Sequence, residues 1–102
     1  MFSLIIAAVA GAALAVIVLK LLNWQKIKDW FMGFFRNRNK IKSPNEVAFT
    51  LKESLANGNC KVVQGIFNKS TDEVEDGVQY ETEKIDNTLA NFHRNDKVVV
   101  YE

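Results

Sequence analysis

Cys60 and His93 are the residues that could support nucleophilic chemistry in this chain of 102 residues, which has one cysteine and one histidine. A cysteine nucleophile needs a base nearby, and only His93 is available for that role. His93 falls near the end of an expected helix, beside Arg94, where a positive charge complements the helix dipole. A histidine that ends a helix is therefore a better interpretation than a catalytic Cys-His pair.

Carboxylates cluster at one point in the second half of the chain, where Asp72, Glu73, Glu75 and Asp76 lie close together. The cluster resembles a cation site, but it lacks the glycine and glutamate positions of an EF-hand loop, and acids on a hairpin usually form a solvated edge. The sequence also has no glycine-rich phosphate loop, no CxxC pair and no nucleophile elbow. It therefore predicts no catalytic, cofactor-binding or metal-binding residue, no cofactor, and a protein that is not an enzyme.

The charges divide the chain into two unlike parts, although the whole carries a net charge of only +1. Residues 1–42 carry seven lysines and arginines against one acid, Asp29, whereas residues 43–102 carry six basic and eleven acidic groups. The lone cysteine excludes an internal disulfide. The acidic balance of the second part argues against nucleic acid as a partner.

The N-terminal segment is a long apolar run, because residues 4–19 contain no polar side chain. A helix over residues 1–22 would span about the 30 Å of a bilayer core, so these residues predict a transmembrane helix. A cleaved signal peptide is a weaker alternative, since no basic residue precedes the run and its apolar core is too long. The basic residues all follow the run, which places the N-terminus outside and the C-terminal domain in the cytoplasm of a single-pass membrane protein.

Small residues repeat along the same segment at a spacing of four, at Ala7, Gly11 and Ala15. In a membrane helix this spacing allows two backbones to approach closely. These three residues therefore predict helix packing, either as self-association or against the helix of a protein partner. The alternative is that the alanines have no role in packing, because alanine is simply common in membrane helices.

Residues 23–42 form a basic, aromatic segment that follows the expected anchor. Its tryptophans and phenylalanines recur on one helical face, and the basic residues lie mainly off that face. A helix of this kind is typical of the membrane interface, against an anionic inner leaflet. The alternative is that the aromatic side chains pack on the following domain. The expected interface residues are Lys20, Trp24, Lys26, Lys28, Trp30, Phe31, Phe34, Phe35 and Arg36.

Residues 43–102 predict a small acidic α+β domain. Ser43 followed by proline and, at position 46, glutamate forms a capping box for a helix that would end at Gly58. Strands are expected over residues 60–67, 73–82 and 97–102, with a helix between the last two that begins at Glu83 and ends near Asn95. The expected fold is thus a membrane-anchored α-β-β-α-β domain with a three-stranded antiparallel sheet, in which the last strand pairs beside the first.

Taken together, the patterns favour a membrane-tethered protein-interaction module, an accessory or assembly subunit of a membrane-associated complex. The expected partners are the lipid bilayer and a protein, or a second copy bound through the transmembrane helix. The alternative is a small membrane-active protein, toxin-like or holin-like, whose alanine-rich helix assembles into a pore. The capped domain over residues 43–102 argues against that alternative, because a pore former needs little beyond its helix.

Overall fold

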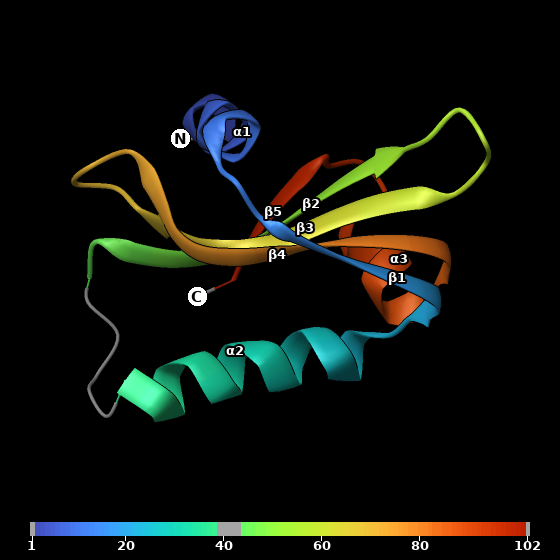
Figure 1. Ribbon diagram of the computed structural model, residues 1–102, viewed down its shortest axis with the longest axis horizontal. Helices are drawn as coiled ribbons and strands as arrows, with labels where there is room; N and C mark the ends of the chain where they lie inside the picture. Colours follow the sequence, from blue (N-terminus) through green and yellow to red (C-terminus); the bar gives the residue numbers. More distant parts are fainter. Residues whose placement is uncertain (1, 39–43, 102) are drawn as a thin grey trace.

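A five-stranded mixed sheet forms the middle layer of the structure, with α1 on one face and α2 and α3 on the other (Figure 1). The computed structural model describes residues 2–38 and 44–101. In chain order the elements are α1 (Phe2–Gly11), β1 (Ala15–Leu22), α2 (Trp24–Arg38), β2 (Glu46–Ser54), β3 (Cys60–Asn68), β4 (Glu73–Ile85), α3 (Asn87–Phe92) and β5 (Val98–Tyr101).

The strands lie in the order β1-β4-β3-β2-β5. β1 runs parallel to β4, with Ile17 beside Tyr80, and the other three pairs are antiparallel. A parallel pair needs a long connection, and here α2 and the β2–β3 hairpin lie between β1 and β4 in the sequence. The two edges of the sheet are therefore β1, from the N-terminal segment, and β5, from the end of the chain.

β2 and β3 are buried on both faces, because they lie in the middle of the sheet. Alternate residues of β2 point to opposite sides: Phe49 packs in the core beneath α1, and Ala48 packs in the core that faces α2. The predicted helix after Ser43 is thus wrong, since residues 46–54 are a strand. Val47 and Leu51 are four residues apart, a spacing that fits a strand as well as a helix when the residue between them, Phe49, is also buried. Ser43 itself lies outside the described residues.

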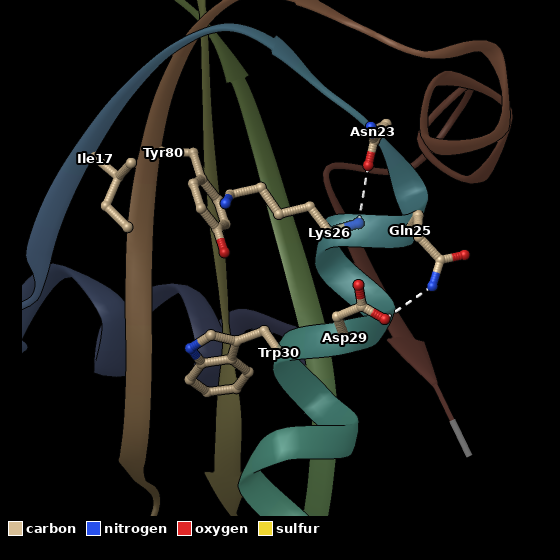
Figure 2. Close-up of a pocket in the computed structure, with 7 residues that line it drawn as sticks. All are labelled: Ile17, Asn23, Gln25, Lys26, Asp29, Trp30 and Tyr80. Carbon is tan, nitrogen blue, oxygen red and sulfur yellow. Dashed lines mark hydrogen bonds between the residues drawn. The ribbon is translucent and has the colours of Figure 1, made fainter.

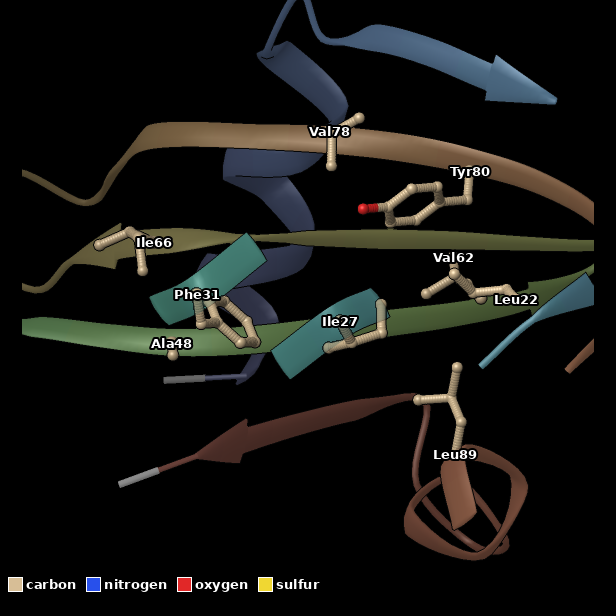
Figure 3. Packing of buried hydrophobic residues seen from close by; sticks show 9 residues of the cluster. All are labelled: Leu22, Ile27, Phe31, Ala48, Val62, Ile66, Val78, Tyr80 and Leu89. Atoms are coloured by element: carbon tan, nitrogen blue, oxygen red, sulfur yellow. The ribbon is translucent and has the colours of Figure 1, made fainter. Parts of the chain in front are cut away.

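Two hydrophobic cores lie on the two faces of the sheet. The core under α1 centres on Phe49 and Phe67, and Ile5 of α1 packs into it. The core on the other face takes Ile27 and Phe31 from α2, Leu89 from α3, and the inward side chains of the sheet (Figure 3). Each helix therefore buries one apolar side against the sheet, which is why a chain of this size forms three layers.

The N-terminal segment departs most from the sequence-based prediction. It forms helix α1, a short turn and then strand β1, instead of one transmembrane helix over residues 1–22. Across residues 2–38 and 44–101 no helix is both long enough and apolar enough to cross a bilayer. The predictions of a membrane-anchored fold and of a single-pass protein, with its N-terminus outside and its domain in the cytoplasm, are wrong. An apolar run rich in valine, isoleucine and leucine suits a sheet strand as well as a membrane helix, and pairing with β4 decides between them.

The predicted sheet was also too small and partly misordered. β3 and β4 form an antiparallel hairpin at the expected positions, but β5 pairs with β2 instead of β3. With residues 46–54 predicted as a helix, the sequence pattern leaves the place beside β3 to the last strand, whereas in the structure β2 occupies it. The helix expected from Glu83 is shorter than predicted, since β4 continues to Ile85 and α3 covers only Asn87–Phe92.

Asp86 joins the two helices that pack on the same face of the sheet. Its backbone N–H donates to the carbonyl of Leu22 at 3.1 Å, where β1 and β4 end side by side. One carboxylate oxygen accepts from the Leu89 N–H at 3.0 Å and caps α3, while the other accepts from the Trp24 N–H at 3.0 Å. Asn23 adds a second cap to α2 by accepting from the Lys26 N–H at 2.8 Å. One carboxylate therefore fixes the starts of both helices relative to each other.

Two glycine-to-alanine substitutions should change stability in opposite directions. A Cβ at Gly65 would lie 2.7 Å from the Asp76 carbonyl oxygen and 3.2 Å from two carbons of the Phe49 ring, so Gly65→Ala should lower the free energy of unfolding by about 1–3 kcal/mol. A Cβ at Gly33, within α2, would meet nothing within 4 Å, so Gly33→Ala should raise it by roughly 0.5–1 kcal/mol. Urea titrations of both variants measure these free energies. A Gly65→Ala protein with the same free energy of unfolding as the wild type would contradict the packing of β3 against Phe49.

Candidate functional site

The exposed edge strand β1 is the most unusual surface of the described residues. Val18 is 76% exposed, and Val16 and Leu21 are each 52% exposed, although all three are large apolar side chains. β1 has one neighbour, β4, so the backbone groups on its other side face outward. The strand carries only one charged residue, Lys20. Edge strands of this length usually carry charges, proline or a bulge that prevent pairing with another chain, and β1 has little such protection.

A hollow of about 500 Å³ opens on the α2 side of this edge, between β1, β4 and α2. Figure 2 shows Ile17 and Tyr80 on the strand side, with Trp30 and the long side chain of Lys26 reaching toward them from α2. The lining is apolar toward the sheet and polar toward solvent. Its members are Ile17, Asn23, Gln25, Lys26, Asp29, Trp30 and Tyr80.

The inner wall of the hollow is rigid because Tyr80 belongs to a buried hydrogen-bond chain. The Tyr80 hydroxyl donates to Gln64 Oε1 at 2.6 Å, and Gln64 Nε2 donates to the backbone carbonyl of Ile27 at 3.0 Å. Burial raises the pKa of Tyr80 to about 12, so the hydroxyl stays protonated and keeps its donor role. These hydrogen bonds tie β4 and β3 to α2 at the inner wall of the hollow.

The outer rim of the hollow carries charge of both signs. Lys26 and Asp29 lie three residues apart on α2, on its exposed side, and Gln25 Nε2 donates to Asp29 Oδ1 at 2.8 Å. Such a site can accept an apolar side chain between Ile17 and Trp30 and contact polar backbone groups at its mouth. It contains neither a nucleophile with a base nor a pair of carboxylates.

A second buried polar group surrounds His93 on the same face of the sheet. His93 Nδ1 lies 2.9 Å from the Asp96 carbonyl oxygen, which can only accept, so Nδ1 carries the proton of the neutral ring. Nε2 then accepts from the Thr50 hydroxyl at 2.7 Å, and Thr50 Oγ1 accepts from the Tyr101 hydroxyl at 2.6 Å. Burial raises the pKa of Tyr101, although its hydrogen bond to Thr50 opposes this.

The His93 group is a structural link between α3, β2 and β5, because every polar atom in it has a partner. Cys60 begins β3, half-buried and opposite Thr82, and neither ring nitrogen of His93 bonds to it. The structure does not bring together the Cys-His pair considered from the sequence. The described residues contain no group of three or more His, Cys, Asp and Glu arranged to hold a metal ion. Asp72, Glu73, Glu75 and Asp76 lie exposed at and beside the turn of the β3–β4 hairpin.

The residues predicted for a membrane interface are divided between the core and solvent. Phe31 is buried, and Trp24, Trp30, Phe34 and Phe35 pack against the core under α2. Trp24 also contacts Phe92 and Tyr101, with ring centroids 4.8 and 5.1 Å apart. The structure thus has the arrangement that the sequence left as the alternative, with the aromatic face packed on the domain. The basic members of that set lie exposed: Lys20, Lys26, Lys28 and Arg36.

The small residues predicted to pack helices do not share one helix. Ala7 and Gly11 lie on α1, where they line a second hollow of about 370 Å³ beside Asp72 and Glu73. Ala15 begins β1, opposite Val78. The spacing of four therefore has no helical meaning beyond Gly11, because α1 ends there.

Sequence reasoning missed both the edge strand and the hollow beside it. The available signal was the β-branched sequence Val16-Ile17-Val18, which favours a strand over a helix. Comparisons with protein-family models, with curated proteins and with solved structures find no match for this chain.

The stability of the fold should fall at mildly acidic pH because of His93. Burial lowers the pKa of His93 below 6.5, with the nearby Lys52 adding to this effect, while Asp96 and the Asp96 and Lys97 backbone oppose it. Between the pKa of His93 in the folded protein and its ordinary value, the histidine is therefore protonated in the unfolded chain and neutral in the folded chain. The stabilisation that neutral His93 contributes is complete above about pH 6.5. It is lost as the pH falls from there toward the lower pKa of His93 in the folded protein.

Urea titrations from about pH 7 to about pH 5 measure this loss, since no other side chain has an ordinary pKa in that window. His93→Gln retains a hydrogen-bonding side chain but cannot titrate, so its stability should change less over the same range. An equal slope in the wild type and the variant would contradict the neutral state assigned to His93.

Proposed function

We propose that this protein is a protein-interaction module that binds an extended segment of a partner along the free edge of β1. The observation that carries the proposal is the exposure of apolar side chains on an edge strand of eight residues. Addition of a strand would satisfy the outward backbone groups of β1 and remove Val16, Val18 and Leu21 from water. Both effects favour binding, the first through directional hydrogen bonds and the second through burial of apolar area.

The hollow beside β1 supplies selectivity in this proposal. A strand added next to β1 places alternate side chains on the α2 face, and the residue opposite Ile17 lies at the mouth of the hollow. Aliphatic or aromatic side chains suit the surface formed by Ile17 and Trp30. Lys26 and Asp29 lie where they can contact polar groups of the bound segment at the rim (Figure 2).

Edge β1 suits this role better than edge β5. β5 has four residues and its side chains are buried or half-buried, so it offers a short ladder and little apolar surface. The role of an accessory or assembly subunit proposed from the sequence is compatible with strand addition. The pore-forming alternative depended on one helix over residues 1–22, and the structure divides those residues between α1 and β1.

A labelled peptide tests strand addition directly. A fluorescein-labelled peptide with the sequence of residues 15–22, flanked by lysines for solubility, should bind the full chain and raise its fluorescence anisotropy in a saturable manner. The matched control is the same peptide with proline at the position of Val18, which removes one N–H donor from the ladder and distorts the strand. We expect the dissociation constant of the control peptide to be about tenfold higher or more, because the loss of one or two hydrogen bonds lowers the affinity by this factor.

Equal binding of the two peptides would contradict strand addition, since adhesion to an apolar surface alone does not require the N–H group. Absence of binding by both would contradict the proposed function as well.

A further inference from the structure

We infer that the segment bound by β1 is the β1 strand of a second copy of this chain, paired antiparallel about a two-fold axis at Leu19. This inference rests on the proposed function and names its partner. The paired strands would join two five-stranded sheets into one continuous sheet. In such a dimer each copy both offers the edge strand and receives it, so the same exposed residues are covered in both copies.

Symmetry and side-chain alternation limit the possible registers. In an antiparallel pair about an axis perpendicular to the sheet, opposed residues must point to the same face, so the two residue numbers sum to an even number. The registers that pair most of β1 centre on Val18 or Leu19. Neither places Lys20 opposite Lys20 of the second copy, so the one charge of β1 does not oppose self-pairing.

The charges favour the register centred on Leu19. In this register Lys20 of the second copy lies opposite Val18, and Val18 is paired with Glu81 of β4. By alternation these three residues share the face on which α1 lies, and Val18 is 76% exposed, so little covers the space above it. The Cα atoms of the lysine and Glu81 would be roughly 10 Å apart, two strand spacings, which their side chains can bridge. The two-fold axis creates this ion pair twice.

The apolar side chains favour the same register. Leu21 is 52% exposed and lies near the end of β1, and in this register it is opposite Ile17 of the second copy. Ile17 is itself 39% exposed, so in this register two exposed apolar side chains lie opposite each other, twice in each dimer. Centred on Val18, the pair would place the exposed Leu21 opposite the small Ala15, and Leu19, which already packs against the core of its own copy, opposite Ile17. Leu19, which packs against the core under α2, lies at the axis.

Sedimentation of the full chain over a dilution series tests the inference. The wild type should have twice the 11.6 kDa mass of one chain and dissociate on dilution. Val18→Lys places the new lysine opposite Lys20 of the second copy, twice in each dimer, and should raise the dimer dissociation constant about tenfold or more. Because Val18 is 76% exposed, the circular dichroism spectrum should be unchanged.

A charge reversal identifies the register. In the double variant Val18→Lys, Lys20→Glu the new lysine faces the new glutamate of the other copy, so dimerisation should return toward the wild-type value. Met32→Lys is the matched control, since Met32 is 51% exposed on α2 and lies outside both β1 and the hollow. It should leave the mass unchanged.

Three outcomes would overturn the inference. A wild-type chain that stays monomeric, a dimer that Val18→Lys does not weaken, or a double variant that is not restored would each contradict the pairing described. A monomer that still binds the β1 peptide would leave the proposed function standing and assign the edge to a different protein. A monomer that binds no peptide would remove both.

Discussion

Asp86 is the point on which the arrangement of the layers depends. β1 and β4 run parallel and end together at Leu22 and Ile85, and a helix begins directly after each strand. Both helices must then satisfy their first N–H groups at the same place. Asp86 does this for both with its two carboxylate oxygens, and its own N–H binds the end of β1. The N-terminal third of the chain is thereby fixed to the end of β4 and the start of α3.

The two faces of the sheet are secured by different means. On the α1 face the contact is apolar, with Ile5 of the helix packed into the core and no charged residue in the helix. On the α2 face buried polar links accompany the apolar core: Tyr80 to Gln64 to Ile27, and Tyr101 to Thr50 to His93. Polar links require specific geometry, so they hold α2 and α3 in one orientation. The hollow at the β1 edge lies between these polar links on one side and the edge strand β1 on the other.

Sequence patterns predict a helix or strand well where one of its faces is buried and the other is exposed to solvent. α2 shows this, because Trp24, Ile27 and Phe31 recur at helical spacing and pack on the sheet as a helical stripe should. Patterns failed where both faces are buried or both exposed. β2 is buried on both faces, so its sequence does not alternate between apolar and polar residues, and the spacing of Val47 and Leu51 fits a helix as well. β1 is apolar and exposed, an arrangement that resembles a membrane segment in sequence.

Local sequence patterns are enough to predict the basic aromatic helix after the apolar N-terminal run, the β3–β4 hairpin and the final strand. These depend on spacing within a few residues, on turn residues such as Asn68 and on the charge pattern, which are local properties. The structure of the apolar N-terminal run depends instead on a contact with a distant part of the chain. Its residues suit either a helix or a strand, and the choice comes from β4, about sixty residues away in the chain, whose open edge offers Ala15–Leu22 a hydrogen-bonding partner that no local pattern contains.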